Sequence, residues 1–330
     1  MREGGDQSKK GVVKESGQGE KRSILVAGCG AIGSVFACLL AEAGHRVCVL
    51  GRRPLVAAAS TGGLRVSGIW GEHRSTPLDG ACEAAAVSGN FDAVLVTCKS
   101  YDTESLLAEL GDRAVPGGVA VSLQNGLGNL ERLEAVYGPE RVLGGRVIFG
   151  AEVIEPGHAR VTVEAEPVLL GSRHGRSELA AEWASVVDRA GIACRPTGDI
   201  EAALWGKVLY NAALNPLGAL LGVPYGELAR DADRRWVMDR VIEEAYAVAR
   251  AEGVALPWKD AGEYRRIFYD RLVPATAGHR SSMLQDLQRG RTTEIDAICG
   301  EVCRRGAARG VDTPLNRLLS ILVRERSAGR

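Results

Sequence analysis

Hydrophobic residues are distributed differently in the two parts of this chain, and the change falls near residue 198. In the first part, short apolar runs are separated by stretches with helical spacing, which is typical of a doubly wound and largely parallel sheet. We expect strands at 23–27, 46–50, 92–97, 119–123 and 193–196, helices at 32–43, 104–110 and 178–190, and hairpins between 144 and 172 at the far edge of the sheet.

Strand patterns are absent after residue 198. Apolar residues there recur at helical spacing and predict helices at 201–221, 234–252, 262–272, 281–289 and 293–309. We therefore expect an α/β Rossmann-type domain, residues 23–198, followed by an all-α domain, residues 199–330. Residues 1–22 are rich in glycine, serine and charge, and they predict a disordered leader without the hydrophobic region of a secretory signal.

One predicted helix, 201–221, carries Lys207, Asn211 and Asn215 at four-residue intervals in an otherwise apolar segment. Side chains four residues apart lie on the same face of an α-helix, so these three form a polar stripe. Burying an ammonium group without a partner is costly, whereas a cleft that receives a polar substrate supplies partners and uses the lysine as a proton donor. Core packing is the competing interpretation of the stripe.

A glycine-rich turn stands between the strand 23–27 and the helix 32–43. Gly28, Gly30 and Gly33 give the spacing G-x-G-x-x-G in the strand-to-helix context that the dinucleotide fingerprint requires. The N-terminus of the following helix presents free N–H groups to a pyrophosphate. We therefore predict that the whole turn contacts a cofactor: Gly28, Cys29, Gly30, Ala31, Ile32 and Gly33.

The residues after the strand 46–50 indicate which dinucleotide binds. An NAD site usually has Asp or Glu there for the ribose diol, whereas this chain has Arg52 and Arg53. A guanidinium group favours a 2′-phosphate, so we predict NADPH with Arg52 as the clamp. The alternative is that both arginines are solvated loop charges.

Lys99 and Asn125 follow two further strands, 92–97 and 119–123. Ligands of open α/β sheets bind at the carboxyl ends of the strands, so both side chains are expected in the cleft. Glu294 lies in a segment where Thr293 and Asp296 form a capping-box pattern. Taken alone, Glu294 is explained most simply as a charge that favours the helix dipole.

Composition excludes several classes of function. Lys plus Arg and Asp plus Glu both number 41, so no overall basic field is available for nucleic acid or an anionic membrane. The eight cysteines form no CxxC pair and are expected as buried thiols in a reducing cytosol. Residues 208–226 carry no charge and are long enough to span a bilayer, but their asparagines, prolines and glycines argue against that interpretation.

Seven ordered motifs resemble the ketopantoate reductase (2-dehydropantoate 2-reductase) family from about residue 23 to the C-terminal region. They are GCGAIG, VTCKS, SLQNGLGN, GAEVIEPG, LWGKVLYNAALNPLGAL, SSMLQDLQRGRTTEID and GVDTPLN. The resemblance implies a Rossmann domain followed by a helical domain of the 6-phosphogluconate dehydrogenase C-terminal type, with NADPH in the cleft between them. It also implies reduction of the C2 carbonyl of a 2-oxo acid, without a metal, in the biosynthesis of pantothenate and coenzyme A.

The resemblance also assigns roles to individual residues. Lys207 matches the proton donor, and Asn211 and Asn215 match substrate contacts. Ser282 matches the serine that binds the substrate carboxylate, and Glu294 matches the glutamate near the nicotinamide ribose and the catalytic centre. The remaining matches to cofactor contacts are the glycine turn, Arg52, Lys99, Asn125 and Ala151.

Three residues depart from the enterobacterial form of the family pattern, namely Tyr225, His279 and Cys299, each of which stands where an asparagine is often found. Since these changes fall in the part that shapes the substrate pocket, an alternative function is NADPH-dependent reduction of another 2-oxo acid, ketone or imine. An alternative from a different class is an NADP-binding sensor without catalysis. The helices after residue 230 offer a face for a homodimer, although nothing in their spacing demands one.

Overall fold

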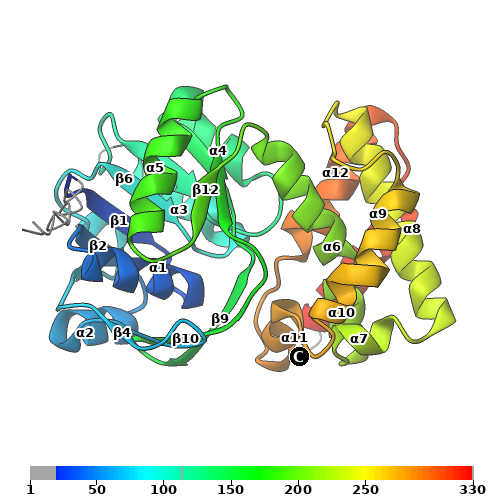
Figure 1. Cartoon of the computed structure of the whole chain (residues 1–330), viewed down its shortest axis with the longest axis horizontal. Helices are drawn as coiled ribbons and strands as arrows, with labels where there is room; N and C mark the ends of the chain where they lie inside the picture. The colour runs from blue at the N-terminus through cyan, green and yellow to red at the C-terminus, as the bar shows by residue number, and fades with distance from the viewer. Residues whose placement is uncertain (1–19, 113, 329–330) are drawn as a thin grey trace, which may run out of the picture.

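The chain folds into a strand-rich part and a helical part that are joined by helix α6 (Figure 1). The computed structural model describes residues 20–112 and 114–328, so residues 1–19 of the predicted leader lie outside the described residues. Every strand precedes α6 in the sequence, and every element after it is helical. The predicted α/β fold followed by an all-α part is therefore confirmed.

The main sheet has eight strands in the order β12-β11-β8-β7-β6-β1-β2-β5. All neighbours run parallel except β11, which is antiparallel to β8. The central strands β6 and β7 are entirely buried, and all their residues except Ser122 are apolar, because helices cover both faces of the sheet. The strands are β1 (Ser23–Ala27), β2 (Arg46–Leu50), β5 (Asp79–Ala81), β6 (Ala93–Val96), β7 (Val119–Ser122), β8 (Val142–Arg146), β11 (Val168–Gly171) and β12 (Cys194–Pro196).

Alternate side chains of each strand enter two different hydrophobic cores. Ile24 and Val26 of β1 join the core that includes α1 (Ala31–Glu42) and α5 (Ser177–Arg189). Leu25 and Ala27 point to the other face and join the core that includes α3 (Thr103–Leu110) and α4 (Asn129–Tyr137). This second core continues without interruption into the helical part, so that part is anchored on one face of the sheet.

A second, four-stranded sheet in the order β4-β3-β10-β9 packs against α1. Its strands are β3 (Arg65–Gly68), β4 (His73–Arg74), β9 (Phe149–Glu155) and β10 (His158–Glu164), and α2 (Arg53–Gly62) precedes β3. Of the region predicted to form hairpins at the far edge of the main sheet, β8 and β11 do pair antiparallel near that edge. The strands β9 and β10 also form a hairpin, but its placement at that edge is wrong, since it lies in the second sheet. The reason is that β10 pairs in parallel with β3, a strand that the sequence pattern did not reveal.

In the helical part, α6 is central and packs against α8, α11 and α13. Within the described ranges, no helix combines the length and apolar character needed to cross a membrane. The predicted helix 262–272 consists of α9 and a following π-helical turn, Phe268–Leu272. The helices are α6 (Ile200–Leu221), α7 (Tyr225–Leu228), α8 (Ala232–Ala251), α9 (Ala261–Ile267), α10 (Val273–Ala275), α11 (Ser282–Gln288), α12 (Cys299–Arg309) and α13 (Pro314–Ala328).

The prediction of one helix over 293–309 is wrong in its first turns. A 3₁₀ turn, η5 (Ile295–Ala297), is followed by a break at Ile298 with φ −102° and ψ −92°, and α12 begins only at Cys299. The predicted capping box is not formed, since no side chain caps η5. Instead, the Ala297 carbonyl accepts a hydrogen bond of 2.8 Å from the Leu127 amide of the strand-rich part. The segment is shaped by contacts between the two parts rather than by helix propensity.

Pro216 lies inside α6 and has no N–H group for the carbonyl of Ala212, four residues earlier. The Cys299 thiol lies 3.9 Å from this oxygen and donates a weak hydrogen bond to it. Cys299 thus compensates in part for the bond that the proline removes from α6.

All eight cysteines are free thiols. Five are buried and two are partly buried, but Cys82 is exposed, so the prediction of a buried thiol is wrong at that position.

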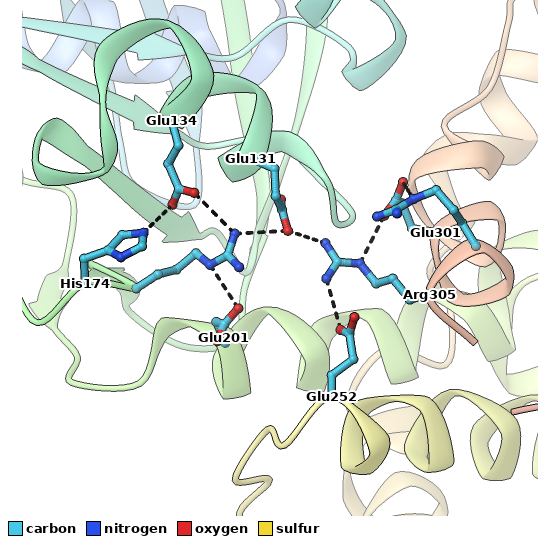
Figure 2. Close-up of polar contacts among 9 residues, drawn as sticks. Glu131, Glu134, His174, Glu201, Glu252, Glu301 and Arg305 are labelled. Carbon is cyan, nitrogen blue, oxygen red and sulfur yellow. Dashed lines mark hydrogen bonds and ion pairs between the residues drawn. The ribbon is translucent and has the colours of Figure 1, made fainter. Parts of the chain in front are cut away.

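Arginines and carboxylates form an ion-pair network that joins the two parts (Figure 2). On α12, Arg305 is only 9% exposed and contacts Glu131 of α4 at 2.5 Å. Its other nitrogen atoms contact Glu252 and Glu301, each at 3.0 Å. This interdomain network comprises Glu131, Glu134, Arg173, His174, Glu201, Glu252, Glu301, Arg304 and Arg305.

The arginines keep the carboxylates of the network ionised. Burial alone would raise the pKa of Glu131, but the charge and hydrogen bond of Arg305, a backbone hydrogen bond and the charge of Arg173 together hold the pKa below its ordinary value. Burial likewise opposes ionisation of Glu301, and the hydrogen bonds and charges of Arg304 and Arg305 together lower its pKa below the ordinary value. The network therefore requires both signs of charge, and loss of one arginine leaves carboxylates facing one another.

We expect Arg305→Met to lower the free energy of unfolding by about 3 kcal/mol, the usual cost of removing one partner of a buried ion pair. Urea unfolding followed by circular dichroism measures this change. Arg230→Met is the matched control, because Arg230 is 76% exposed and pairs with Glu227 at the surface, where such a pair contributes about 0–1 kcal/mol. Equal destabilisation by both variants would contradict the importance of the buried network.

Candidate active site

In the turn between β1 and α1, close packing requires glycine at positions 28 and 33 but leaves space at Gly30. Gly28 has φ +87°, and a Cβ atom there would lie 2.3 Å from the Cβ of Cys98. A Cβ at Gly33 would lie 2.5 Å from Thr97 Oγ1, which is the close approach of helix to strand expected for the third glycine. At Gly30, an added Cβ would meet nothing nearer than a carbonyl oxygen at 4.0 Å. The backbone at Gly30 is thus accessible to a ligand.

The first turn of α1 has the properties of an anion site. Gly30 occupies the N-cap without a capping side chain, and the turn contains no acidic residue, so its N–H groups remain available. Ala31 and Ile32 are the first helical residues. Burial raises the pKa of the adjacent Cys29 thiol to about 12, so this side chain adds no negative charge. The turn fits the pyrophosphate of a dinucleotide.

Arg52 lies two residues after the end of β2 and occupies the N-cap of α2. Among the described residues, neither Arg52 nor the exposed Arg53 has an ion-pair partner, so both guanidinium groups are available. Burial raises the pKa of Asp102, and the charge of Arg52 opposes that rise. Since Asp102 lies just beyond β6, Arg52 acts at the carboxyl edge of the sheet, where the glycine turn also lies.

Lys207 of α6 reaches across to the strand-rich part. Its Nζ donates to Asn125 Oδ1 at 2.6 Å and to the carbonyl of Val147 at 2.7 Å. Burial lowers the pKa of Lys207 to about 8, Glu294 opposes this shift, and Arg146 adds to it. Because an ammonium group has three N–H donors, one remains for a further acceptor.

Lys99, Glu294 and Asn125 form a connected cluster beside Lys207. Glu294 is 7% exposed, and its Oε2 accepts from Lys99 Nζ at 3.2 Å and from Asn125 Nδ2 at 3.4 Å. Its other oxygen accepts from the amide and hydroxyl of Ser100, each at 3.2 Å. Glu294 therefore influences Lys207 through Asn125 and through its charge, and the structure shows no direct hydrogen bond between Glu294 and Lys207.

Asp286 of α11 belongs to this cluster and was not predicted from the sequence. It is 7% exposed and accepts from Lys99 Nζ at 2.9 Å. Burial alone would lower the pKa of Lys99, but Glu294 and Asp286 raise it above its ordinary value, so Lys99 is a fixed cation. The only sequence signal was the position of Asp286 four residues after Ser282 on the same helix.

The other predicted substrate residues lie on α6 and α11. Asn211 is 8% exposed, and within the described ranges its side chain has no hydrogen-bond partner; its polar atoms are nevertheless not sealed from solvent. Asn215, one turn further on, accepts from the hydroxyl of Tyr225 at 2.6 Å. Ser282 is exposed in the first turn of α11, whereas its neighbour Ser281 is buried and caps that helix through the Leu284 amide.

Two features lie outside the cluster around Lys207. Ala151 is in β9, which packs against α1, and its side chain lies against the core under that helix. A cavity of about 840 Å³ opens beside Glu294, between η5 and the helices α12 and α13, and Lys207 does not line it. Four arginines and four carboxylates line this cavity, so it favours neither anions nor cations.

Comparison with known proteins identifies the family of both parts of the chain. The family described as "Ketopantoate reductase PanE/ApbA" matches residues 24–174, and the family described as its C-terminal domain matches residues 199–327. A 2-dehydropantoate 2-reductase of Aquifex aeolicus is 38% identical over 303 residues, which cover 91% of this chain and 96% of that protein. The corresponding protein of Archaeoglobus fulgidus is 35% identical, with 93% and 98% of the two chains covered.

A solved structure shows the same arrangement of both parts. The crystal structure of a PanE/ApbA family ketopantoate reductase from Ralstonia eutropha has a TM-score of 0.82 to this chain at 33% identity, and the match covers 93% of this chain and 99% of that one. Sequence and fold therefore agree over nearly the whole length. This chain belongs to the ketopantoate reductase family of oxidoreductases, which act on CH–OH groups with a nicotinamide cofactor.

Proposed function

We propose that this protein reduces ketopantoate (2-dehydropantoate) to pantoate with NADPH and so serves pantothenate and coenzyme A biosynthesis. The observation that carries the proposal is the buried ammonium group of Lys207, which is held by Asn125 and the Val147 carbonyl and keeps one N–H free. A lysine whose pKa is lowered to about 8 is suited to general acid catalysis near neutral pH. The names of the relatives support ketopantoate as the substrate.

Gly28, Gly30 and Gly33 would hold NADPH, which would supply a hydride to the C2 carbonyl carbon. Lys207 donates the free N–H to the carbonyl oxygen and transfers its proton to the alkoxide, so that the C=O group becomes CH–OH. Asn125 holds the ammonium group in place, and Glu294 favours its charged form. Asn211 and Asn215 can donate to oxygen atoms of the substrate, and Ser282 to its carboxylate.

Steady-state assays of ketopantoate reduction, with NADPH and NADH in parallel, test the proposed substrate and cofactor. In these assays we expect Lys207→Ala to reduce turnover by at least about a hundredfold, the usual effect of losing a general acid, while NADPH binding stays nearly intact. Lys259→Ala is the matched control because Lys259 is an exposed lysine of the helical part. A fully active Lys207→Ala enzyme would overturn the assignment of the proton donor.

Reduction should depend on pH through Lys207. Because only the protonated amine can donate, kcat/KM for ketopantoate is expected to be constant below about pH 8 and to fall as pH rises through that value. Glu294→Gln removes the charge that raises the pKa of Lys207, so its profile should break at a lower pH. An unchanged break in this variant would show that the titrating group is not coupled to Glu294.

Arg52→Ala should weaken NADPH binding far more than NADH binding, because only NADPH carries a 2′-phosphate for the free guanidinium group. Dissociation constants from fluorescence titration of each cofactor measure the two effects. Arg53→Ala serves as the control for removal of an exposed neighbouring charge. Equal weakening of both cofactors by Arg52→Ala would remove the argument for a phosphate clamp at this position.

A further inference from the structure

Tyr225 is held rigidly at the start of α7. Its ring is 4% exposed and packs between Tyr210, with ring centres 5.8 Å apart, and His279, at 5.2 Å. Its amide donates to the His279 carbonyl at 3.0 Å, and the next amide, of Gly226, donates to Ala277 at 2.8 Å. Both the backbone and the ring are thus fixed against the loop that precedes α11.

The hydroxyl of Tyr225 controls the side chain of Asn215. It donates to Asn215 Oδ1 at 2.6 Å. Burial raises the pKa of Tyr225 well above its ordinary value, so the hydroxyl keeps its proton. With Oδ1 occupied in this way, the amide group of Asn215 cannot rotate without losing a buried hydrogen bond.

The nitrogen atom of the Asn215 amide, Nδ2, is free to donate a hydrogen bond. Asn215 is 6% exposed, yet its Nδ2 atom has no hydrogen-bond partner among the described residues and is not sealed from solvent. On the stripe of α6 that also carries Lys207, Asn215 therefore has an unused hydrogen-bond donor, while its oxygen already accepts from Tyr225.

We propose that Tyr225 determines substrate specificity by fixing Asn215 with its amide nitrogen toward the substrate. The site then selects 2-oxo acids with an acceptor oxygen, such as a hydroxyl, on the carbon chain beyond the keto group. The inference rests on the proposed function, because it takes Lys207 as the residue at the keto group. Tyr225 itself does not react. It positions Asn215, and His279 and Tyr210 keep its ring in place.

The test compares two substrates that differ in one group: ketopantoate, and 3,3-dimethyl-2-oxobutanoate, which lacks only the 4-hydroxyl. We expect the wild-type protein to prefer ketopantoate by about tenfold in kcat/KM, the value of one net hydrogen bond. Tyr225→Phe keeps the ring and releases the Asn215 amide. In this variant, the preference for ketopantoate in kcat/KM should fall at least threefold. The cause should be a higher KM for ketopantoate, while kcat/KM for 3,3-dimethyl-2-oxobutanoate should change little.

Tyr210→Phe is the matched control. It removes the hydroxyl of a neighbouring tyrosine that bonds to Thr276 instead of Asn215, so the preference should stay at the wild-type value. Asn215→Ala gives a second measurement: it should abolish the preference, and adding Tyr225→Phe in that background should change the ratio no further.

The outcomes separate the inference from the proposed function. If the wild-type protein reduces both compounds equally well, or if Tyr225→Phe leaves the preference at the wild-type value, as is expected of Tyr210→Phe, the specificity role is wrong and 2-oxo acid reduction stands. If the wild-type protein reduces neither compound, the proposed function fails and the inference fails with it.

Discussion

The hydrogen bond between Lys207 and Asn125 is the interaction on which the arrangement of the site depends. It joins the middle of α6 to the carboxyl end of a strand in the main sheet, so it forms only when both parts are correctly placed. It also removes much of the cost of burying an ammonium group, because the charge is met by an amide oxygen and a backbone carbonyl. The lowered pKa and the free N–H of Lys207 both follow from this position.

Charges around the site are arranged in two groups with different tasks. Lys99 is fixed between Asp286 and Glu294, which leaves Lys207 as the cation whose proton can be transferred. The interdomain network around Arg305 is linked to the Asn125 loop, since Glu131 lies in the first turn of α4, the helix that follows this loop. Gly128 of this loop lies so close to Glu301 that an added Cβ would come within 3.1 Å of its carboxylate. The loop that carries Asn125 is therefore held from the helical side.

Local patterns were sufficient to predict the elements that carry most of the site. The strands around Gly28, Lys99 and Asn125 are continuous apolar runs, and the stripe on α6 needs only helical periodicity. Contacts between distant segments were not predictable in this way. Three contacts join residues of different elements that only the tertiary fold brings together. They are the parallel pairing of β3 with β10, the bond of Lys99 to Asp286 and the bond of Tyr225 to Asn215. The break at Ile298 likewise reflects the docking of Ala297 on Leu127, which no propensity encodes.

The hydrophobic core on one face of the sheet extends without interruption into the helical part. Two lobes with separate cores can melt independently, but here α6 contributes Trp205 and Val208 to the same core as Leu25 and Val96 of the sheet. Loss of either part would expose apolar surface of the other to water. The helical part is thus no detachable module: its separation would leave apolar surface of both parts in water, and a bond such as that of Lys207 to Asn125 exists only while both are folded and joined.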